Sequence, residues 1–311
     1  MSAHPQQAQG SGPERKPVTL PQIAEMKLSA EPIVMVTAYD HPSAQIAEAA
    51  GVDVVLVGDS AAMTVLGYDS TVPVSVDEMV MLAAAVRRGL ETPLLVGDMP
   101  FGSYESSDQQ AVENAQRFVK EAGCDAVKLE RGGASVERAR AIIRAGIPVM
   151  GHVGLTPQTA TALGGFKAQG KTASRAAQIA EDALALQAIG CFSIVFEAMP
   201  AEVTATLMPR MNTAAIIGIG AGADTDGQVL VFHDLLGIFG GHAPKFVKRY
   251  ADVRSEMVRG VTAYADEVRS RAFPAPEHTY AVEPEELEAF RRYLDQETLA
   301  ETDWDWSATE I

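Results

Sequence analysis

Leu94-Leu-Val-Gly-Asp98 is a short apolar run that ends on an aspartate, and six other apolar runs in this chain end on a polar residue or a glycine turn. Short apolar runs separated by helical segments predict βα units around a parallel sheet. In a (β/α)8 TIM barrel, the carboxyl ends of all strands open onto one face, where the active site lies. The sequence therefore predicts an α/β TIM barrel with several acids gathered in one pocket. The other runs are Ile33–Asp40, Val54–Asp59, Ala126–Glu130, Pro148–His152, Ile194–Glu197 and Ile216–Gly220.

Helix signals fall between these runs. Ser75-Val-Asp-Glu78 is a capping box that predicts a helix through Arg88. Ser107 predicts the start of the next helix, and Ser174 precedes an amphipathic segment. The eighth strand is predicted near Leu236–Phe239. A doubly wound open sheet is the alternative, and it ranks lower because helices and strands keep alternating without a break in composition.

Composition limits the classes of function. The chain has 311 residues, of which 47% are hydrophobic and only 6% aromatic, which suits one aliphatic barrel of about 250 residues with extensions. The net charge of −16 argues against non-specific binding to nucleic acid, which depends on clustered Lys and Arg. An anionic substrate stays possible, because a metal or one lysine can reverse the local field.

The cysteines and the apolar runs indicate the compartment. Cys124 and Cys191 each come just before a predicted strand, where each is expected to pack as a small apolar residue. Nothing suggests a disulfide framework, no run approaches the length of a membrane span, and the N-terminus lacks the apolar stretch of a signal peptide. We expect a soluble, cytoplasmic protein.

Three segments are expected along the chain: a disordered segment over residues 1–17, the barrel over 18–275 and an acidic extension over 276–311. Within the extension, residues 283–311 hold half of the net charge, both tryptophans (Trp304 and Trp306) and an expected helix from Glu285 to about Leu299. It is either a solvated appendage or a segment that docks on a neighbouring subunit.

The acids at the strand ends suggest a metal site. Asp59, Asp98 and Glu130 together would form a hard oxygen site suited to Mg²⁺, although an aspartate in such a place can also cap a helix. Lys128 precedes Glu130 by two residues, so both point to the same face of a strand. Lys128 would bind a ligand carboxylate, pair with Glu130 or form a Schiff base.

Two further strand-end residues are candidates for chemistry. Glu197 ends an otherwise apolar strand and suits a general base, with a cap or ion pair as the alternative. His152 either hydrogen-bonds a ligand or orients a group that does, behind the residues that touch the substrate. Gly218–Gly222 is either a phosphate-binding turn or a tight βα turn, and Gly164–Gly170 is either a lid or a plain loop.

Seven motifs occur in order along the chain: Val57–Ser60, Tyr68–Thr71, Ala85–Gly89, Asp98–Phe101, Val127–Glu130, Gly151–Gln158 and Gly240–Phe246. This ordered set resembles the ketopantoate hydroxymethyltransferase family over roughly residues 20–275. The resemblance implies a barrel of the phosphoenolpyruvate mutase and isocitrate lyase type. It also implies transfer of a hydroxymethyl group from 5,10-methylenetetrahydrofolate to 3-methyl-2-oxobutanoate, which gives 2-dehydropantoate in pantothenate biosynthesis. The resemblance further implies a requirement for Mg²⁺ and assembly as a homodecamer, which is common in the family.

The resemblance also assigns roles to residues. Asp59, Asp98 and Glu130 match the metal site of the family, and Glu197 matches its proton acceptor. Substrate contacts fall on Asp59, Ser60, Asp98 and Lys128.

The chain departs from the family pattern at several places. Arg131 stands between Glu130 and Gly132, where the family usually reads Lys-Leu-Glu-Gly-Gly. Ala61-Ala62 replaces Leu-Gly, and the acidic end is longer than usual.

Two alternatives come from other classes. One is a Mg²⁺-dependent C–C lyase of the isocitrate lyase kind, which would need a cysteine in a mobile loop. The other is a barrel without activity that serves as a binding partner.

Overall fold

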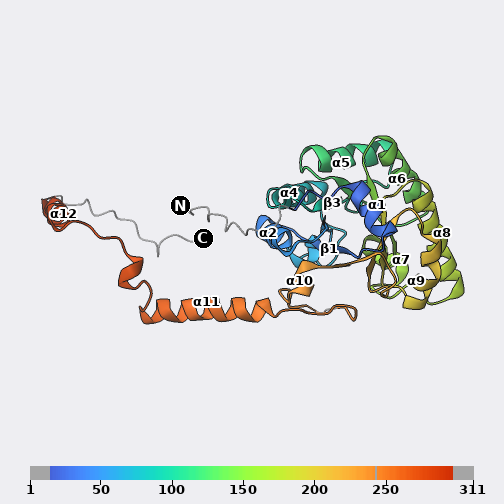
Figure 1. Cartoon of the computed structure of the whole chain (residues 1–311). Helices are drawn as coiled ribbons and strands as arrows, with labels where there is room; N and C mark the ends of the chain where they lie inside the picture. Colours follow the sequence, from blue (N-terminus) through green and yellow to red (C-terminus); the bar gives the residue numbers. More distant parts are fainter. Residues whose placement is uncertain (1–14, 242–243, 297–311) are drawn as a thin grey trace, which may run out of the picture. The chain divides into compact units, whose positions relative to one another are not determined.

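Eight parallel strands form a closed barrel in the computed structural model, which describes residues 15–241 and 244–296 (Figure 1). Each strand pairs with the next along the chain, and the eighth pairs with the first. The predicted TIM barrel is therefore confirmed. The strands are β1 Ile33–Thr37, β2 Val54–Val57, β3 Leu94–Asp98, β4 Ala126–Lys128, β5 Val149–Gly154, β6 Ser193–Glu197, β7 Ala215–Ile219 and β8 Gly227–Leu230.

Helices surround the strands as an outer layer (Figure 1). The helices of the barrel unit are α1 Leu20–Leu28, α2 His41–Ala50, α3 Ala61–Thr64, α4 Val76–Arg87, α5 Asp108–Lys120, α6 Ala134–Arg144, α7 Ala160–Leu163, α8 Ala173–Ala188, α9 Ala201–Leu207 and α10 Phe232–Leu235. The predicted capping box of α4 is present, with Ser75 and Glu78 bonding each other's backbone amides. Ser107 caps α5 as predicted, whereas the side chain that caps α8 belongs to Thr172 rather than Ser174.

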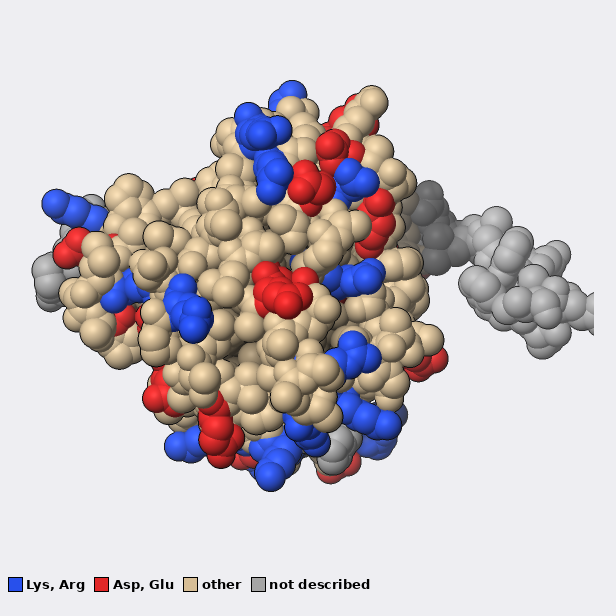
Figure 2. Space-filling model, turned by 90° about the vertical axis from the view of Figure 1, so that its right-hand side faces the viewer, with Lys and Arg blue, Asp and Glu red and all other residues tan. Residues whose placement is uncertain are grey.

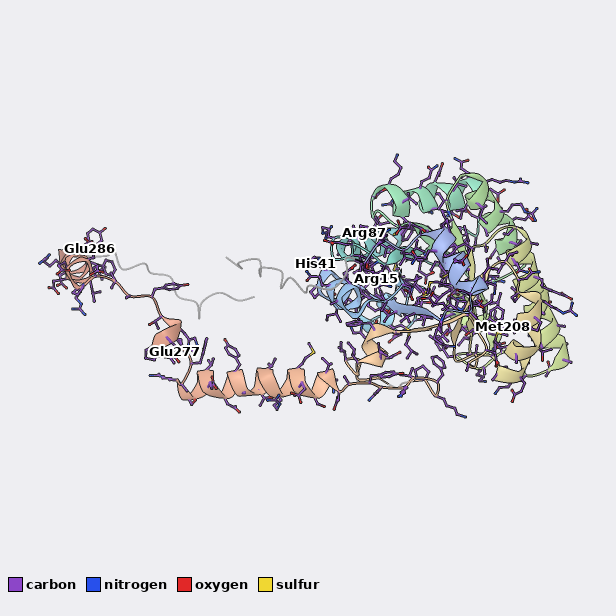
Figure 3. The ribbon with its side chains drawn as sticks, in the orientation of Figure 1. Arg15, His41, Arg87, Met208, Glu277 and Glu286 are labelled. Atoms are coloured by element: carbon purple, nitrogen blue, oxygen red, sulfur yellow. The ribbon has the colours of Figure 1, made fainter. Side chains whose placement is uncertain are left out.

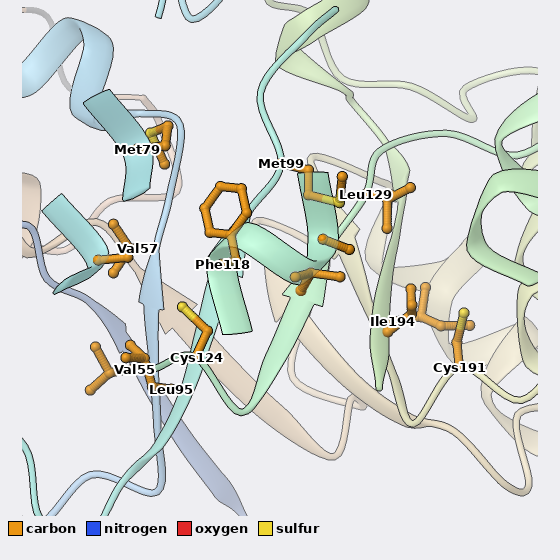
Figure 4. Close-up of a cluster of buried hydrophobic side chains, with 14 of the residues drawn as sticks. Val55, Val57, Met79, Leu95, Met99, Phe118, Cys124, Leu129, Cys191 and Ile194 are labelled. Atoms are coloured by element: carbon orange, nitrogen blue, oxygen red, sulfur yellow. The ribbon is translucent and has the colours of Figure 1, made fainter. Parts of the chain in front are cut away.

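The apolar strands are buried on both faces, because alternate residues point inward and toward the helices. In β2, Val54 and Leu56 belong to the cluster inside the barrel, while Val55 and Val57 belong to the cluster under the helices. Figure 4 shows part of this outer cluster, in which Phe118 of α5 lies close to Cys124. Both cysteines are buried and free, as expected from their positions before strands.

Helix α1 closes the amino-terminal end of the barrel. Its buried residues Ile23 and Met26 pack in the same cluster as Ile33, the first residue of β1. Lys27 in its last turn pairs with Asp226 just before β8, at 2.7 Å between Nζ and Oδ2. Because α1 covers the amino-terminal end, a ligand site is expected at the carboxyl ends of the strands.

The predicted position of the eighth strand is wrong. Residues 236–239 follow α10 and contain no strand, whereas β8 lies at Gly227–Leu230 and pairs with β1 and β7. The true strand begins with a glycine for a steric reason, since a Cβ on Gly227 would lie 2.3 Å from the carbonyl oxygen of Ile33. The apolar side chains of Leu236 and Ile238 pack against the outer cluster instead, which explains their misleading pattern.

A second compact unit, Ser255–Ile311, follows the barrel unit. It contains most of α11 Val253–Ser270, and then α12 Pro284–Gln296, where a helix was predicted from Glu285 (Figure 3). Residues 297–311, with both tryptophans, and residues 1–14 of the expected disordered segment lie outside the described residues. The expected boundary at residue 275 stays a prediction. No helix in the described ranges is both long and apolar enough to cross a bilayer.

The charge of the chain is spread over the face of the molecule seen in Figure 2. Lysine and arginine side chains alternate there with aspartate and glutamate side chains, and uncharged residues cover most of the area. The net charge of −16 therefore does not appear on this face as one acidic patch.

Candidate active site

The strand-end residues singled out in the sequence meet in one cavity of about 840 Å³ at the carboxyl end of the barrel. This cavity is the candidate active site, because ligands of such barrels bind at this end. The predicted residues that line it are Asp59, Ser60, Asp98, Lys128, Glu130, His152 and Glu197.

Three buried acids form its inner end. Asp59, Asp98 and Glu130 are 4%, 1% and 0% exposed, and the backbone amide of Asp59 donates to Oδ2 of Asp98 at 3.1 Å. Burial, followed by the charges of Asp98 and Glu130, raises the pKa of Asp59 well above its usual range. Burial also raises the pKa of Asp98, against the opposing effect of Lys128. An additional cation here would relieve the repulsion.

Lys128 is the buried cation of the cluster. Its Nζ lies 2.8 Å from Oδ1 of Asp98 and 3.7 Å from Oε1 of Glu130. Burial alone would lower the pKa of Lys128, but the charges of Asp98, Glu130 and Asp59 outweigh it, so the pKa is raised. Lys128 therefore stays charged, which suits binding of an anion and disfavours a Schiff-base role, because that role needs a neutral amine.

His152 links the acid cluster to Glu197. Its Nδ1 lies 3.3 Å from Oε1 of Glu130, and its Nε2 lies 3.2 Å from Oε2 of Glu197. Burial and Lys128 act to lower the pKa of His152, but its close contacts with the two glutamates raise it to about 9. At neutral pH this imidazole is therefore protonated, and its charge lies between Glu130 and Glu197. The predicted orienting role fits this geometry.

Ser60 has a buried aromatic partner that sequence reasoning missed. The hydroxyls of Ser60 and Tyr39 lie 2.8 Å apart, at the mouth of β2. Tyr39 is 1% exposed, and burial raises its pKa to about 12, so the phenol remains neutral. Tyr39 therefore fixes the direction in which Ser60 points.

Gln158 is the second residue that the sequence did not single out. Its Nε2 donates to Oδ2 of Asp59 at 3.0 Å, and its backbone amide donates to Oε2 of Glu130 at 3.0 Å. Its own Oε1 accepts from the hydroxyl of Tyr104 at 2.5 Å. One residue thus contacts two acids that follow different strands, Asp59 through its side chain and Glu130 through its backbone. The sequence feature that could have identified Gln158 is its position at the end of the motif Gly151–Gln158.

Loops form the outer part of the cavity. Phe166, Lys167 and Ala168 come from the glycine-rich loop between α7 and α8, where Gly164, Gly165 and Gly170 have positive φ. Residues 244–247 contribute the opposite side. The run Gly218–Gly222 forms a turn with positive φ at Gly220 and Gly222, and a Cβ on Gly220 would lie 2.5 Å from the ring of Phe246. This geometry favours the tight turn over a phosphate site.

Arg131 does not disturb the acid cluster. It adopts a φ of +77°, a conformation that glycine adopts more readily, and its backbone amide donates to the carbonyl of His152 at 2.9 Å. Its exposed side chain lines a second, smaller cavity of about 280 Å³ together with Arg175 and Asp182, while Glu130 stays buried.

Gly97 directly precedes Asp98, and its lack of a side chain is required by helix packing. A Cβ there would lie 2.5 Å from the ring of Phe118 on α5. Gly97 therefore lets α5 pack close against β3.

The acid cluster fits Mg²⁺. Among the described residues, no three His, Cys, Asp or Glu side chains converge as ready-made metal ligands. Mg²⁺ does not require this, because it is usually held by one or two carboxylates, retained waters and the substrate. Oδ1 of Asp98 and Oε1 of Glu130 are buried without a well-directed hydrogen bond in the described part of the chain, so both remain able to accept a cation.

Solved structures with the same architecture define the class of protein. Phosphoenolpyruvate phosphomutase from Streptomyces platensis subsp. rosaceus superposes with a TM-score of 0.55 at 13% identity, covering 89% of this chain and 97% of that chain. Phosphonopyruvate hydrolase, in a structure with oxalate and Mg²⁺, superposes with a TM-score of 0.54 at 11% identity, covering 89% and 98%. The fold is thus the (β/α)8 barrel of these two enzymes.

Sequence comparison narrows this class to one family. The chain matches the family model of ketopantoate hydroxymethyltransferase over residues 17–276, and it belongs to that family. A 3-methyl-2-oxobutanoate hydroxymethyltransferase of Moorella thermoacetica is 53% identical over 271 residues, covering 86% of this chain and 99% of the relative. The mitochondrial 3-methyl-2-oxobutanoate hydroxymethyltransferase 1 of Arabidopsis thaliana is 50% identical over 280 residues, covering 88% and 80%. The chain is therefore an enzyme of the hydroxymethyltransferase class.

Proposed function

We propose that this chain transfers a hydroxymethyl group from 5,10-methylenetetrahydrofolate to 3-methyl-2-oxobutanoate, which gives 2-dehydropantoate. Membership of the family supports the reaction, because the curated relatives carry the name of this transferase. The observation that carries the proposal is the meeting of three buried acids, a charged lysine and Glu197 in one cavity. An α-keto acid offers a carboxylate to the lysine and two oxygens to a cation.

Mg²⁺ would be held by Asp59, Asp98 and Glu130, the acids at the inner end of the cavity. When bound, Mg²⁺ supplies a Lewis acid that polarises the ketone of the keto acid and so favours loss of the neighbouring proton. The ammonium of Lys128 and the hydroxyl of Ser60 would bind the substrate and partly neutralise its carboxylate. A neutral residue in place of Lys128 would leave the inner end of the cavity strongly anionic.

Glu197 would remove the C3 proton. It is the last residue of β6, and its side chain is 15% exposed, so it reaches the cavity while most of it is shielded from water. His152 holds Oε2, and Oε1 has no hydrogen-bond partner among the described residues. The proton would move to Oε1, and the electrons of the C3–H bond would form the C2–C3 double bond of the enolate. Water would hydrolyse the methylene bridge of the folate, so that both C–N bonds break, N5 and N10 keep the electrons and each take a proton, and the one-carbon unit is released as formaldehyde. C3 of the enolate would then bond to the formaldehyde carbon, whose oxygen takes the proton held by Glu197 and becomes the hydroxyl.

Proton exchange tests this assignment without the folate. Proton NMR of 3-methyl-2-oxobutanoate in D2O should show loss of the C3 signal that depends on both the protein and Mg²⁺. Added methylenetetrahydrofolate should then give 2-dehydropantoate. Glu197→Gln should slow the exchange by about 10²–10⁴-fold and keep substrate binding, as measured by calorimetry.

Glu202→Gln is the matched control, because Glu202 is exposed in the first turn of α9. It should leave both exchange and transfer unchanged. Exchange that survives in Glu197→Gln at the wild-type rate would overturn the role of Glu197.

The lyase alternative receives no support from the cysteines. Cys124 and Cys191 precede β4 and β6, at the ends of these strands that lie away from the cavity, and each is 3% exposed. Burial raises the pKa of both thiols to about 12, which makes them poor acids and poor nucleophiles near neutral pH. We therefore rank the transferase above the lyase.

A further inference from the structure

The cavity is larger than the proposed keto acid substrate alone would fill. Pockets for drug-sized ligands measure about 300–1,000 Å³, and this one measures about 840 Å³. The acids, Lys128 and His152 are all buried at the inner end, where a five-carbon keto acid would meet them. A second and larger ligand therefore has room in the outer part of the same cavity.

The outer part differs from the inner part in its side chains. It is lined by apolar and aromatic residues, among which the ring of Phe166 is 57% exposed on the loop before α8. An exposed aromatic ring at a cavity mouth offers a flat surface for stacking. Phe239 and Phe246 line the cavity from the segments that follow α10.

Two lysines that line the cavity have no partner among the described residues. Lys167 follows Phe166, and Lys245 lies on the segment 244–247. In contrast to Lys128, neither ammonium makes an ion pair or a hydrogen bond with any described residue. In a chain with a net charge of −16, two unpaired cations beside a cavity form a local site for carboxylates.

We propose that the outer part of the cavity binds the p-aminobenzoyl-glutamate portion of the folate, with Lys167 and Lys245 binding the glutamate carboxylates. Phe166 packs against an aromatic ring of the folate in this arrangement. The inference rests on the proposed function, since it assigns the co-substrate of that reaction to named residues. It places the one-carbon unit between the loops and the acids, where the deprotonated keto acid would meet it.

Charge reversal at both lysines tests the assignment. Lys167→Glu and Lys245→Glu are each expected to raise the KM for methylenetetrahydrofolate about 5-fold, and the double variant about 20-fold. The comparison co-substrate is the primary amide of methylenetetrahydropteroate, which lacks the glutamate and has no carboxylate. Its KM should be the same in the wild type and the double variant, and its turnover shows that the variants are folded.

The matched control is Lys171→Glu, an exposed lysine four residues beyond Lys167 that does not line the cavity. Its KM values should equal those of the wild type. Equal losses for both co-substrates, or no loss for either, would overturn the lysine assignment while wild-type transfer still supports the proposed function. A folded wild type that neither exchanges the C3 proton nor forms product would overturn the function and this inference together.

Discussion

The inner and outer parts of the cavity are built in opposite ways. At the inner end, acids on strand ends are held by hydrogen bonds and ion pairs, as in the contact of Gln158 with Asp59 and of Lys128 with Asp98. At the outer end, loop residues such as Phe166 and Lys167 are exposed. Proton transfer requires atoms fixed to fractions of an ångström, whereas a large ligand can be bound by side chains that adapt.

Glycines show the same division. A Cβ on Gly97 would collide with Phe118, so this glycine allows the helix to pack close to the strand behind Asp98. A Cβ on Gly164 or Gly165 would meet nothing within 4 Å, and both have positive φ, so these glycines serve backbone conformation alone. The inner glycine is a packing element, and the outer glycines allow a turn.

Removal of the buried cation should give the largest effect on stability. Lys128→Met leaves Asp98 and Glu130 buried beside each other without their partner, which typically costs about 3–5 kcal/mol. Denaturant unfolding without Mg²⁺ measures this loss. Lys120→Met, at an exposed position at the end of α5, should change the free energy of unfolding by less than about 0.5 kcal/mol. Similar values for the two variants would contradict the ion-pair description.

The stability contributed by His152 should depend on pH. Its pKa rises from 6.5 to about 9 in the folded state, which corresponds to stabilisation on the order of 3 kcal/mol. Because the folded pKa is the higher one, the stabilisation is complete below about pH 6.5 and disappears as pH rises to about 9. The difference in unfolding free energy between the wild type and His152→Gln, without Mg²⁺, should therefore shrink across this window. A difference independent of pH would show that His152 is not charged.

Loss of the side-chain contact between Gln158 and Asp59 should weaken the metal site. Gln158→Leu removes the side-chain donor to Asp59 and the acceptor of the Tyr104 hydroxyl, and loss of such supporting contacts typically costs 10–100-fold in metal affinity. Calorimetric titration with Mg²⁺ in the presence of the keto acid measures this affinity in the wild type and the variant. Gln109→Leu, on the exposed face of α5, is the control. Unchanged affinity in Gln158→Leu would place the metal away from Asp59.

The smallest effect on stability is expected at the outer end. Phe166→Ala should change the unfolding free energy by less than about 0.5 kcal/mol, because the ring is 57% exposed. Phe118→Ala, which removes a fully buried ring, should cost about 3–5 kcal/mol. Thermal unfolding of the two variants compares them directly. A large loss for Phe166→Ala would show that the outer loop is part of the folded core.

The sequence predicted those parts of the site that depend on one strand at a time. Asp98 and Glu130 could be found because each follows an apolar run, and parallel strands place their carboxyl ends on one face. Gln158 could not be found in this way, since its partner Asp59 lies 99 residues earlier and they meet only in the closed barrel. The particular substrate came from the family resemblance, because the residue types alone specify no more than a cation and an acid.

The eighth strand shows the limit of apolar patterns for the fold. Gly227–Leu230 is short and begins where no side chain fits against Ile33, so steric fit selects a glycine over a typical strand former. Gln228 adds a polar residue, and the more apolar residues 236–239 pack against the outer cluster as irregular chain. Local composition alone therefore does not identify the segment that closes the barrel.

The closure of the barrel by α1 has a kinetic consequence. Ile23 and Met26 pack under the strands, and in the described part of the chain the loops line the outer part of the cavity. A folate bound in the outer part, as proposed, would cover the keto acid beneath it. The keto acid would then bind first and the folate second, and the spent folate would depart before 2-dehydropantoate. The enzyme is thus expected to follow a compulsory order, with 2-dehydropantoate competing against the keto acid but not against the folate.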